Sequence, residues 1–103
     1  MIKVSVFYPN KPSARFDTAY YFATHMPMVA RKVGGVIKTT SVDQGVAGLA
    51  PGSPPAFVMI AHFTFESVGA FQAAFAPHAA EIMGDIPNYT SIEPIIQISD
   101  VKI

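Results

Sequence analysis

The stretch "AFVMIAHFTFE", residues 56–66, determines the fold that this sequence predicts. Read as a β-strand, it places the odd-numbered residues from Phe57 to Phe65 on one side and the even-numbered residues from Val58 to Thr64 on the other. Both sides are largely apolar, which is typical of a strand that is covered on both faces. We therefore expect a strand here, in a sheet with a layer packed against each of its faces.

A strand, a helix and a second strand are predicted upstream of this stretch. Apolar residues alternate over Ile2–Tyr8, which indicates the first strand. The helix extends from about Asp17, which is placed to cap it, to Val33, where a Gly-Gly pair ends it. β-Branched residues then favour a strand over about Val36–Gln44.

The Gly/Pro-rich stretch Gly45–Pro55 is predicted to form a long loop between the second and third strands. Loops of this length are uncommon inside compact domains and are often functional, lids included. After the third strand, Ser67 can cap a second helix, and Pro77 suits the first turn of a renewed helical segment. A last strand is expected from about Ile92 to Val101, with Pro94 at an edge or a bulge.

The resulting order, βαββαβ, predicts an α+β ferredoxin-like domain that spans residues 1–103. In that fold both helices lie on one face of a single antiparallel sheet. Since the third strand is apolar on both sides, we expect the open face to pack against the same face of a second copy, as a homodimer. Composition supports this expectation, because half of the residues are hydrophobic and only 14% are charged.

Composition also argues against several classes of function. Seven basic and seven acidic residues balance without any charge run, so the basic footprint of nucleic-acid binding is missing. The chain has no cysteine, which excludes disulfides and a thiolate nucleophile. Residues 44–65 carry no charge, but glycines and prolines interrupt them too often for a membrane helix, and the N-terminus lacks signal-peptide features. We therefore expect a cytoplasmic protein.

The segment "YYFATHMPMV", residues 20–29, contains the first candidate for chemistry. At 100° per residue, Phe22, Met26 and Val33 fall on one arc with Ala19, Val29 and Ala30, while His25 borders that arc on the side of Tyr21. Pro27 removes a backbone donor and can bend the helix, which would open a cavity beside His25. The residues alone leave open whether His25 faces a cavity or is a core histidine bonded to a carbonyl.

His78 and His62 are the other imidazoles. His78 follows a proline at the start of a helical turn, where the helix dipole favours a neutral, proton-accepting ring, and Glu81 lies on the same face. The alternative is a solvated His–Glu pair. His62 either lines a pocket or lies at the subunit interface. A metal site made of the three histidines and Glu81 is disfavoured, because no HExxH or similar spacing is present.

The segments "YYFATHMPMV" and "FAPHAAEIMGDIPNYTSIEPIIQIS" resemble the EthD family, named for ethyl tert-butyl ether degradation, and the resemblance extends nearly from end to end. It implies membership of the dimeric α/β-barrel superfamily, with a ligand cavity between sheet and helices. Similar superfamily members include cofactor-independent quinone-forming monooxygenases, muconolactone isomerases and polyketide cyclases, in which histidines act as acids and bases. The isomerase-like resemblance points to His25 and the cyclase-like resemblance to His78. The cysteine that the isomerases pair with histidine is missing here.

These observations lead to one hypothesis and two alternatives. The hypothesis is a homodimer that acts without a cofactor or metal on a small hydrophobic molecule, aromatic or lactone-like, in an oxidoreductase, monooxygenase or isomerase step. His25 would be the general base and His78 a second acid–base group, with Tyr21, His62 and Met28 lining the site. The first alternative is a non-catalytic carrier that serves a separate oxygenase system. The second is a protein whose only function is assembly.

Overall fold

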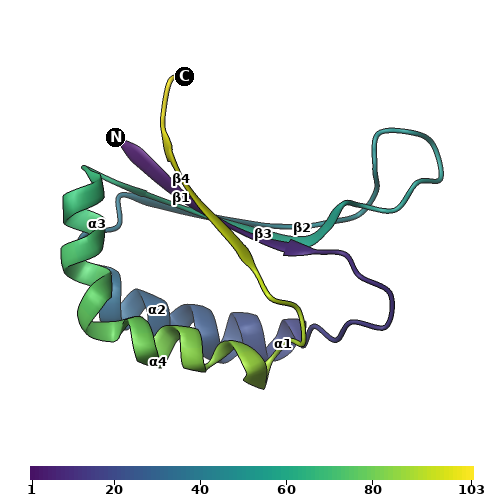
Figure 1. Ribbon diagram of the computed structural model, residues 1–103, viewed down its shortest axis with the longest axis horizontal. Helices are drawn as coiled ribbons and strands as arrows, with labels where there is room; N and C mark the ends of the chain where they lie inside the picture. Colours follow the sequence, from purple (N-terminus) through teal and green to yellow (C-terminus); the bar gives the residue numbers. More distant parts are fainter.

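The computed structural model describes all residues from Met1 to Ile103. Four antiparallel strands form one sheet in the order β2-β3-β1-β4. Their bounds are β1 Ile2–Pro9, β2 Thr39–Gln44, β3 Phe57–Phe65 and β4 Ile95–Asp100. Both helical units lie on one face of this sheet (Figure 1). The ferredoxin-like α+β fold and its βαββαβ order are therefore confirmed.

Each helical unit is built from short segments that follow one another directly. The first consists of α1 Thr18–Tyr20, the π-helical turn η1 Tyr21–His25 and α2 Met26–Val33. The second consists of α3 Val68–Phe75, the 3-10 turn η2 Ala76–His78 and α4 Ala79–Gly84, with a further 3-10 turn, η3 Ile86–Asn88, after it. None of these helices combines the length and apolarity that crossing a bilayer requires.

Strand register decides which side chains meet the helices. Val4 of β1 pairs with Phe63 of β3 on one side and with Ile98 of β4 on the other. Side chains alternate along a strand, so the even-numbered residues of β1 and the odd-numbered residues of β3 share the helix-covered face. The buried side chains of Val4 and Phe65 pack there with Met28 and Val33 of α2 in one core cluster.

Two strands begin later than the sequence predicts. β2 begins at Thr39, because Val36 and Ile37 turn inward and pack half-buried against the core cluster. β4 begins at Ile95, because the Ile92 side chain is buried in the core cluster that also contains Tyr89, and the Ile92 N–H donates to the Thr90 hydroxyl at 3.0 Å. In both places burial of an apolar side chain overrides the local β pattern.

The first helix is not the uniform α-helix that the sequence predicts from Asp17 to Val33. In the π-turn the Met26 N–H donates to the carbonyl of Tyr21, five residues earlier, whereas an α-helix would use the carbonyl four residues earlier. Pro27 follows at once; it has no N–H and its ring crowds the turn before it. The wider turn therefore lies where the proline predicts a disturbance.

The π-turn also changes which residues face the sheet. Phe22, which the 100° rule places on the buried arc, is 45% exposed, whereas Tyr21 and His25 are buried. The prediction for Phe22 was wrong because the extra residue in this turn rotates the preceding side chains relative to α2. His25 consequently points inward rather than along the border of the helix.

Side chains cap both helical units as the sequence predicts. The Asp17 carboxylate accepts the Tyr20 N–H at 3.0 Å, and the Ser67 hydroxyl accepts the Ala70 N–H at 3.1 Å. Each cap satisfies one of the N–H groups that a helix leaves without a partner in its first turn.

Replacing Ser67 by alanine should therefore lower the free energy of unfolding by about 1 kcal/mol. Urea denaturation followed by circular dichroism measures this loss, and Ser67→Thr, which keeps a hydroxyl, is the matched control. Equal stability of the alanine and threonine variants would contradict the assignment of Ser67 as the cap.

The face of the sheet opposite the helices carries no helix of this chain (Figure 1). It mixes aromatic side chains with hydrogen-bonded polar ones. The Ser5 hydroxyl lies 2.8 Å from Nδ1 of His62, and Phe7 meets the His62 ring edge-on at 6.3 Å. His62 is thus a satisfied polar group on the open face.

Candidate active site

A cavity of about 310 Å³ lies between the helices and the sheet. Its size is at the lower end of the range for small-molecule pockets, roughly 300–1,000 Å³. Sixteen residues from β1, β3, β4 and the helical units line it, and among them only His25 and the phenol of Tyr8 carry a polar side-chain atom. No Lys, Arg, Asp or Glu lines the cavity. A ligand here would be held mainly by apolar contact.

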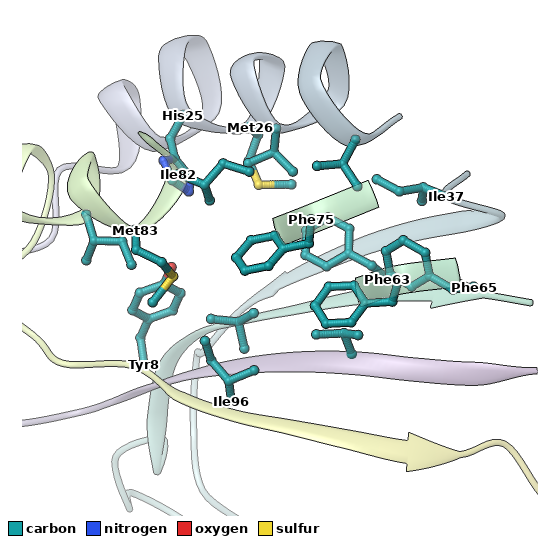
Figure 2. A pocket seen from close by; sticks show the side chains of 16 residues that line it. Tyr8, His25, Met26, Ile37, Phe63, Phe65, Phe75, Ile82, Met83 and Ile96 are labelled. Carbon is teal, nitrogen blue, oxygen red and sulfur yellow. The ribbon is translucent and has the colours of Figure 1, made fainter. Parts of the chain in front are cut away.

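The two polar groups lie at the same end of the cavity. Figure 2 shows His25 reaching in from the helix and Tyr8 from the strand below, while Phe63 and Phe65 line the opposite end. Both His25 and Tyr8 also contact the ring of Tyr89, at centroid distances of 4.6 and 6.2 Å. The cavity therefore has one polar end and one hydrocarbon end.

His25 is held by a carboxylate behind it. Nδ1 of His25 lies 2.9 Å from Oδ2 of Asp85. A carboxylate only accepts hydrogen bonds, so we assign a proton to Nδ1, which leaves Nε2 of the neutral ring free to accept one. The ring itself is buried, at 5% exposure, and stacks on Tyr21 at 5.8 Å with an interplanar angle of 16°.

Asp85 is in turn fixed by two further donors. The Tyr20 hydroxyl donates to Oδ1 at 2.7 Å, and Nδ2 of Asn88 donates to the same oxygen at 2.9 Å. Burial by itself would raise the pKa of Asp85, but the hydrogen bonds from Asn88, Tyr20 and His25 outweigh it, so the pKa lies below its ordinary value. Asp85 is therefore an anion at neutral pH and can stabilise a protonated His25.

Three buried tyrosines pack against one another next to His25. The hydroxyls of Tyr8 and Tyr89 lie 2.7 Å apart, and Tyr21 packs against both rings. Burial is the main cause that raises the pKa of each of these three phenols. All three therefore stay protonated near pH 7 and can act as hydrogen-bond donors, but not as bases.

The structure separates the residues that the sequence nominated for the site. His25 lines the cavity, and Tyr21 stacks on His25 from behind the lining. Met28 is buried in the core, beside a groove on the outer surface of the helices, and does not line the cavity. His62 lies on the opposite face of the sheet, so it is not positioned to contact a ligand of this cavity.

His78 also lies outside the cavity, at the junction of η2 and α4. The predicted pairing with Glu81 is not seen, because Glu81 approaches Lys32 of α2 instead, at 3.4 Å. The histidines are thus dispersed over the fold, and no group of three or more metal-ligating side chains gathers.

Sequence reasoning missed the residues that support His25. Asp85 and Asn88 were not nominated, because Asp85 follows His25 by 60 positions and no local spacing links them. The fold brings the end of α4 beside η1. A signal was present only in hindsight: an isolated Asp followed by Pro and Asn, in a segment with few charges.

The loop Gly45–Pro55 contributes nothing to the lining. It extends beyond the end of the sheet, with the Val46 and Leu49 side chains almost fully exposed (Figure 1). In this structure the loop does not cover the cavity. The lining residues with the most exposed side chains are Met83 of α4 and Ile96 of β4, which places the entrance between these two elements.

Comparison with known proteins identifies the family. The EthD domain matches residues 12–93 of this chain. The chain belongs to the EthD family. An EthD-like protein from Ralstonia eutropha JMP134 is 50% identical, with a TM-score of 0.93 over 99% of this chain and 92% of that one. No protein of curated function is significantly similar.

Two more distant structures agree with this EthD-family fold. An ethyl tert-butyl ether degradation (EthD) family protein from Bacillus halodurans C-125 is 18% identical, with a TM-score of 0.67 over 99% of both chains. A dimeric protein of unknown function and ferredoxin-like fold from Bacteroides fragilis NCTC 9343 is 9% identical, with a TM-score of 0.57 over 97% of this chain and 95% of that one. At these identities the likeness concerns the fold alone.

Proposed function

We propose that this EthD-family protein is an enzyme that binds a small, uncharged, apolar organic molecule in the cavity and moves a proton with His25. One observation carries the proposal: the only imidazole in a mainly apolar cavity has its rear nitrogen bonded to a partly buried, ionised carboxylate. A base, an orienting group behind it and a space in front of it are the parts that general base catalysis requires.

In the proposed mechanism Nε2 of His25 takes a proton from the bound molecule. Asp85 keeps the ring in the productive tautomer and stabilises the imidazolium that forms, without itself taking the proton. The apolar lining strengthens this attraction, because few water molecules compete inside the cavity. General acid–base catalysis of this kind contributes about 10²–10⁴-fold in rate.

The lining also restricts the substrate. Without Lys or Arg in the cavity, a carboxylate or phosphate would be buried unpaired, which is unfavourable. The proposed substrate is therefore neutral, and the step is an isomerisation, or an oxidation by dissolved dioxygen, that begins with proton removal. The proposal gives no role in the cavity to His78, His62 or Met28.

A homodimer through the open sheet face is part of this proposal. It is supported by the uncovered face of the sheet, by the apolar composition and by the dimeric ferredoxin-like protein of similar fold. Sedimentation of the purified protein at several concentrations tests it, and a monomer at all of them would contradict it.

The test of the proposed chemistry is an NMR titration of the imidazoles with a panel of small phenols, quinones and lactones. We expect a ligand that shifts the methyl signals of Met26 and Met83 to shift the His25 ring signals too, and not those of His78. Turnover of that ligand should fall about 10²–10⁴-fold in His25→Gln, whereas the matched control His78→Gln should keep it.

Two outcomes would speak against the proposal. Full turnover by His25→Gln would remove this residue from the chemistry. Binding in the cavity without conversion of any panel member would instead favour a carrier that hands its ligand to a separate oxygenase.

A further inference from the structure

We infer that the Tyr8 hydroxyl, backed by Tyr89, binds the oxygen of a carbonyl substrate whose neighbouring carbon loses a proton to His25. The inference rests on the proposed function and narrows it to a substrate class: small, neutral ketones or lactones that can enolise. Tyr8 would then be a catalytic residue in its own right, because it touches the group on which negative charge develops.

The hydrogen-bond pattern of the tyrosine pair supports this role. Tyr89 is fully buried and does not line the cavity, and the one side-chain partner of its hydroxyl is the Tyr8 hydroxyl at 2.7 Å. A buried hydroxyl must place its proton on an acceptor, so we orient this bond from Tyr89 to the Tyr8 oxygen. The Tyr8 proton is then free to donate into the cavity that Tyr8 lines.

The bond from Tyr89 also makes Tyr8 a better donor. In a chain of hydroxyls each hydrogen bond polarises the next, and the low polarity of the surroundings strengthens the effect. Burial raises the pKa of Tyr8, and hydrogen bonding to Tyr89 and Tyr21 offsets part of that rise. The phenol thus remains protonated and can stabilise an oxyanion without giving up its proton.

His25 and Tyr8 supply every group that the proposed step requires. Nε2 of His25 removes a proton from the carbon next to the carbonyl. The electron pair of the broken C–H bond forms a C=C bond, and the carbonyl π electrons move to oxygen as an enolate, which receives the Tyr8 hydrogen bond. Where the substrate also has a C=C bond next to this carbon, the enolate is a conjugated dienolate, and return of the same proton from Nε2 to its far carbon completes an isomerisation without an external reactant.

The position of Tyr8 fits a ligand that spans the cavity. His25 and Tyr8 lie at the polar end of the cavity, and hydrocarbon side chains line its other end (Figure 2). A carbonyl group would lie at the polar end and a ring or alkyl chain between the phenylalanines. The absence of a cation from the lining leaves Tyr8 as the one donor that faces developing negative charge there.

The experiment uses two probes on the intact protein. The first compares the affinity of 2-naphthol, whose hydroxyl mimics an enol oxygen, with that of 2-methylnaphthalene, which has the same shape without it. The second follows exchange of the α-protons of 2-tetralone in D₂O by NMR. The variants are Tyr8→Phe, Tyr89→Phe and His25→Gln, and His78→Gln, outside the cavity, is the control.

We expect the wild-type protein to prefer 2-naphthol and to accelerate exchange. Tyr8→Phe should abolish the preference, keep the affinity for 2-methylnaphthalene and slow exchange about 10²–10³-fold, the usual effect of removing one oxyanion donor. Tyr89→Phe should have a smaller effect in the same direction, and it replaces Tyr8→Phe if that variant does not fold.

Each contrary result has a distinct meaning. If His25→Gln abolishes exchange but both tyrosine variants retain it, the inference about Tyr8 is wrong and the proposed function stands. If His25→Gln retains exchange, the proposed function fails. Absence of both exchange and the naphthol preference in the wild-type protein would overturn the assignment of carbonyl substrates.

Discussion

Replacing Asp85 by asparagine should lower the rate of proton transfer by about 10²–10⁴-fold while hardly changing the affinity for apolar ligands. The reason is that His25 contacts Oδ2 of Asp85, whereas two other donors hold Oδ1. Tyr20 and Asn88 both donate to Oδ1 of Asp85, so they would hold the carbonyl oxygen of the introduced amide at that position. The amide N–H₂ would then face Nδ1 of His25 and force it to accept.

A His25 ring that accepts at Nδ1 must carry its proton on Nε2, the nitrogen proposed to act as base. Nitrogen-15 NMR distinguishes the two tautomers directly and needs no substrate. We expect Asp85→Asn to move the His25 proton from Nδ1 to Nε2, and we expect 2-tetralone exchange to slow in parallel.

The matched control is Asn88→Ala, which removes one donor to Oδ1 but keeps the carboxylate. It should leave the tautomer unchanged and slow exchange much less than Asp85→Asn does. If Asp85→Asn keeps the Nδ1–H tautomer and the wild-type rate, the orienting role of Asp85 is refuted.

Replacing Tyr89 by alanine should cost about 3–5 kcal/mol of the free energy of unfolding, the range for truncating a fully buried aromatic side chain. The Tyr89 side chain has no exposed surface and packs against the rings of Phe16, Tyr21 and His25, at centroid distances of 5.5, 5.2 and 4.6 Å. Its removal would leave a void where these rings converge and deprive the Tyr8 hydroxyl of its partner.

Guanidinium denaturation measures the loss, and Tyr89→Phe separates its two components. The phenylalanine variant keeps the ring and removes only the hydroxyl, so it should lose about 1 kcal/mol. Equal losses of unfolding free energy in the two variants would show that packing of the Tyr89 ring contributes little. The contact between this ring and His25 would then not be what positions His25.

The architecture of this protein could be predicted from local patterns in its sequence. The order of strands and helices, the caps at Asp17 and Ser67 and the division of β3 into two alternating sides were all predicted from local patterns. Each depends on residues within a few positions of one another, where period-2 and period-3.6 hydrophobicity and capping chemistry operate.

Predictions failed where packing outweighed the local pattern. Phe22 was assigned to the core by an ideal helical period, but the π-turn before Pro27 turned Tyr21 and His25 inward instead. Pro27 indicates a disturbance at this turn, but the 100° rule that was applied to Phe22 assumes a regular α-helix. Glu81 was expected beside His78 and approaches Lys32 of α2.

What the sequence alone determined is therefore the ferredoxin-like architecture and the candidacy of His25, because both follow from short-range periodicity and from a proline beside a histidine at the border of the apolar arc. What only the tertiary structure decided is the chemistry available to that histidine. The cavity is the volume left between two layers. Asp85, the residue after α4, bonds to His25, and Tyr8 of β1 lines the same end of the cavity, although both lie far from His25 in the chain. Chain folding sets such distances through the packing of all layers at once, and no local spacing records them.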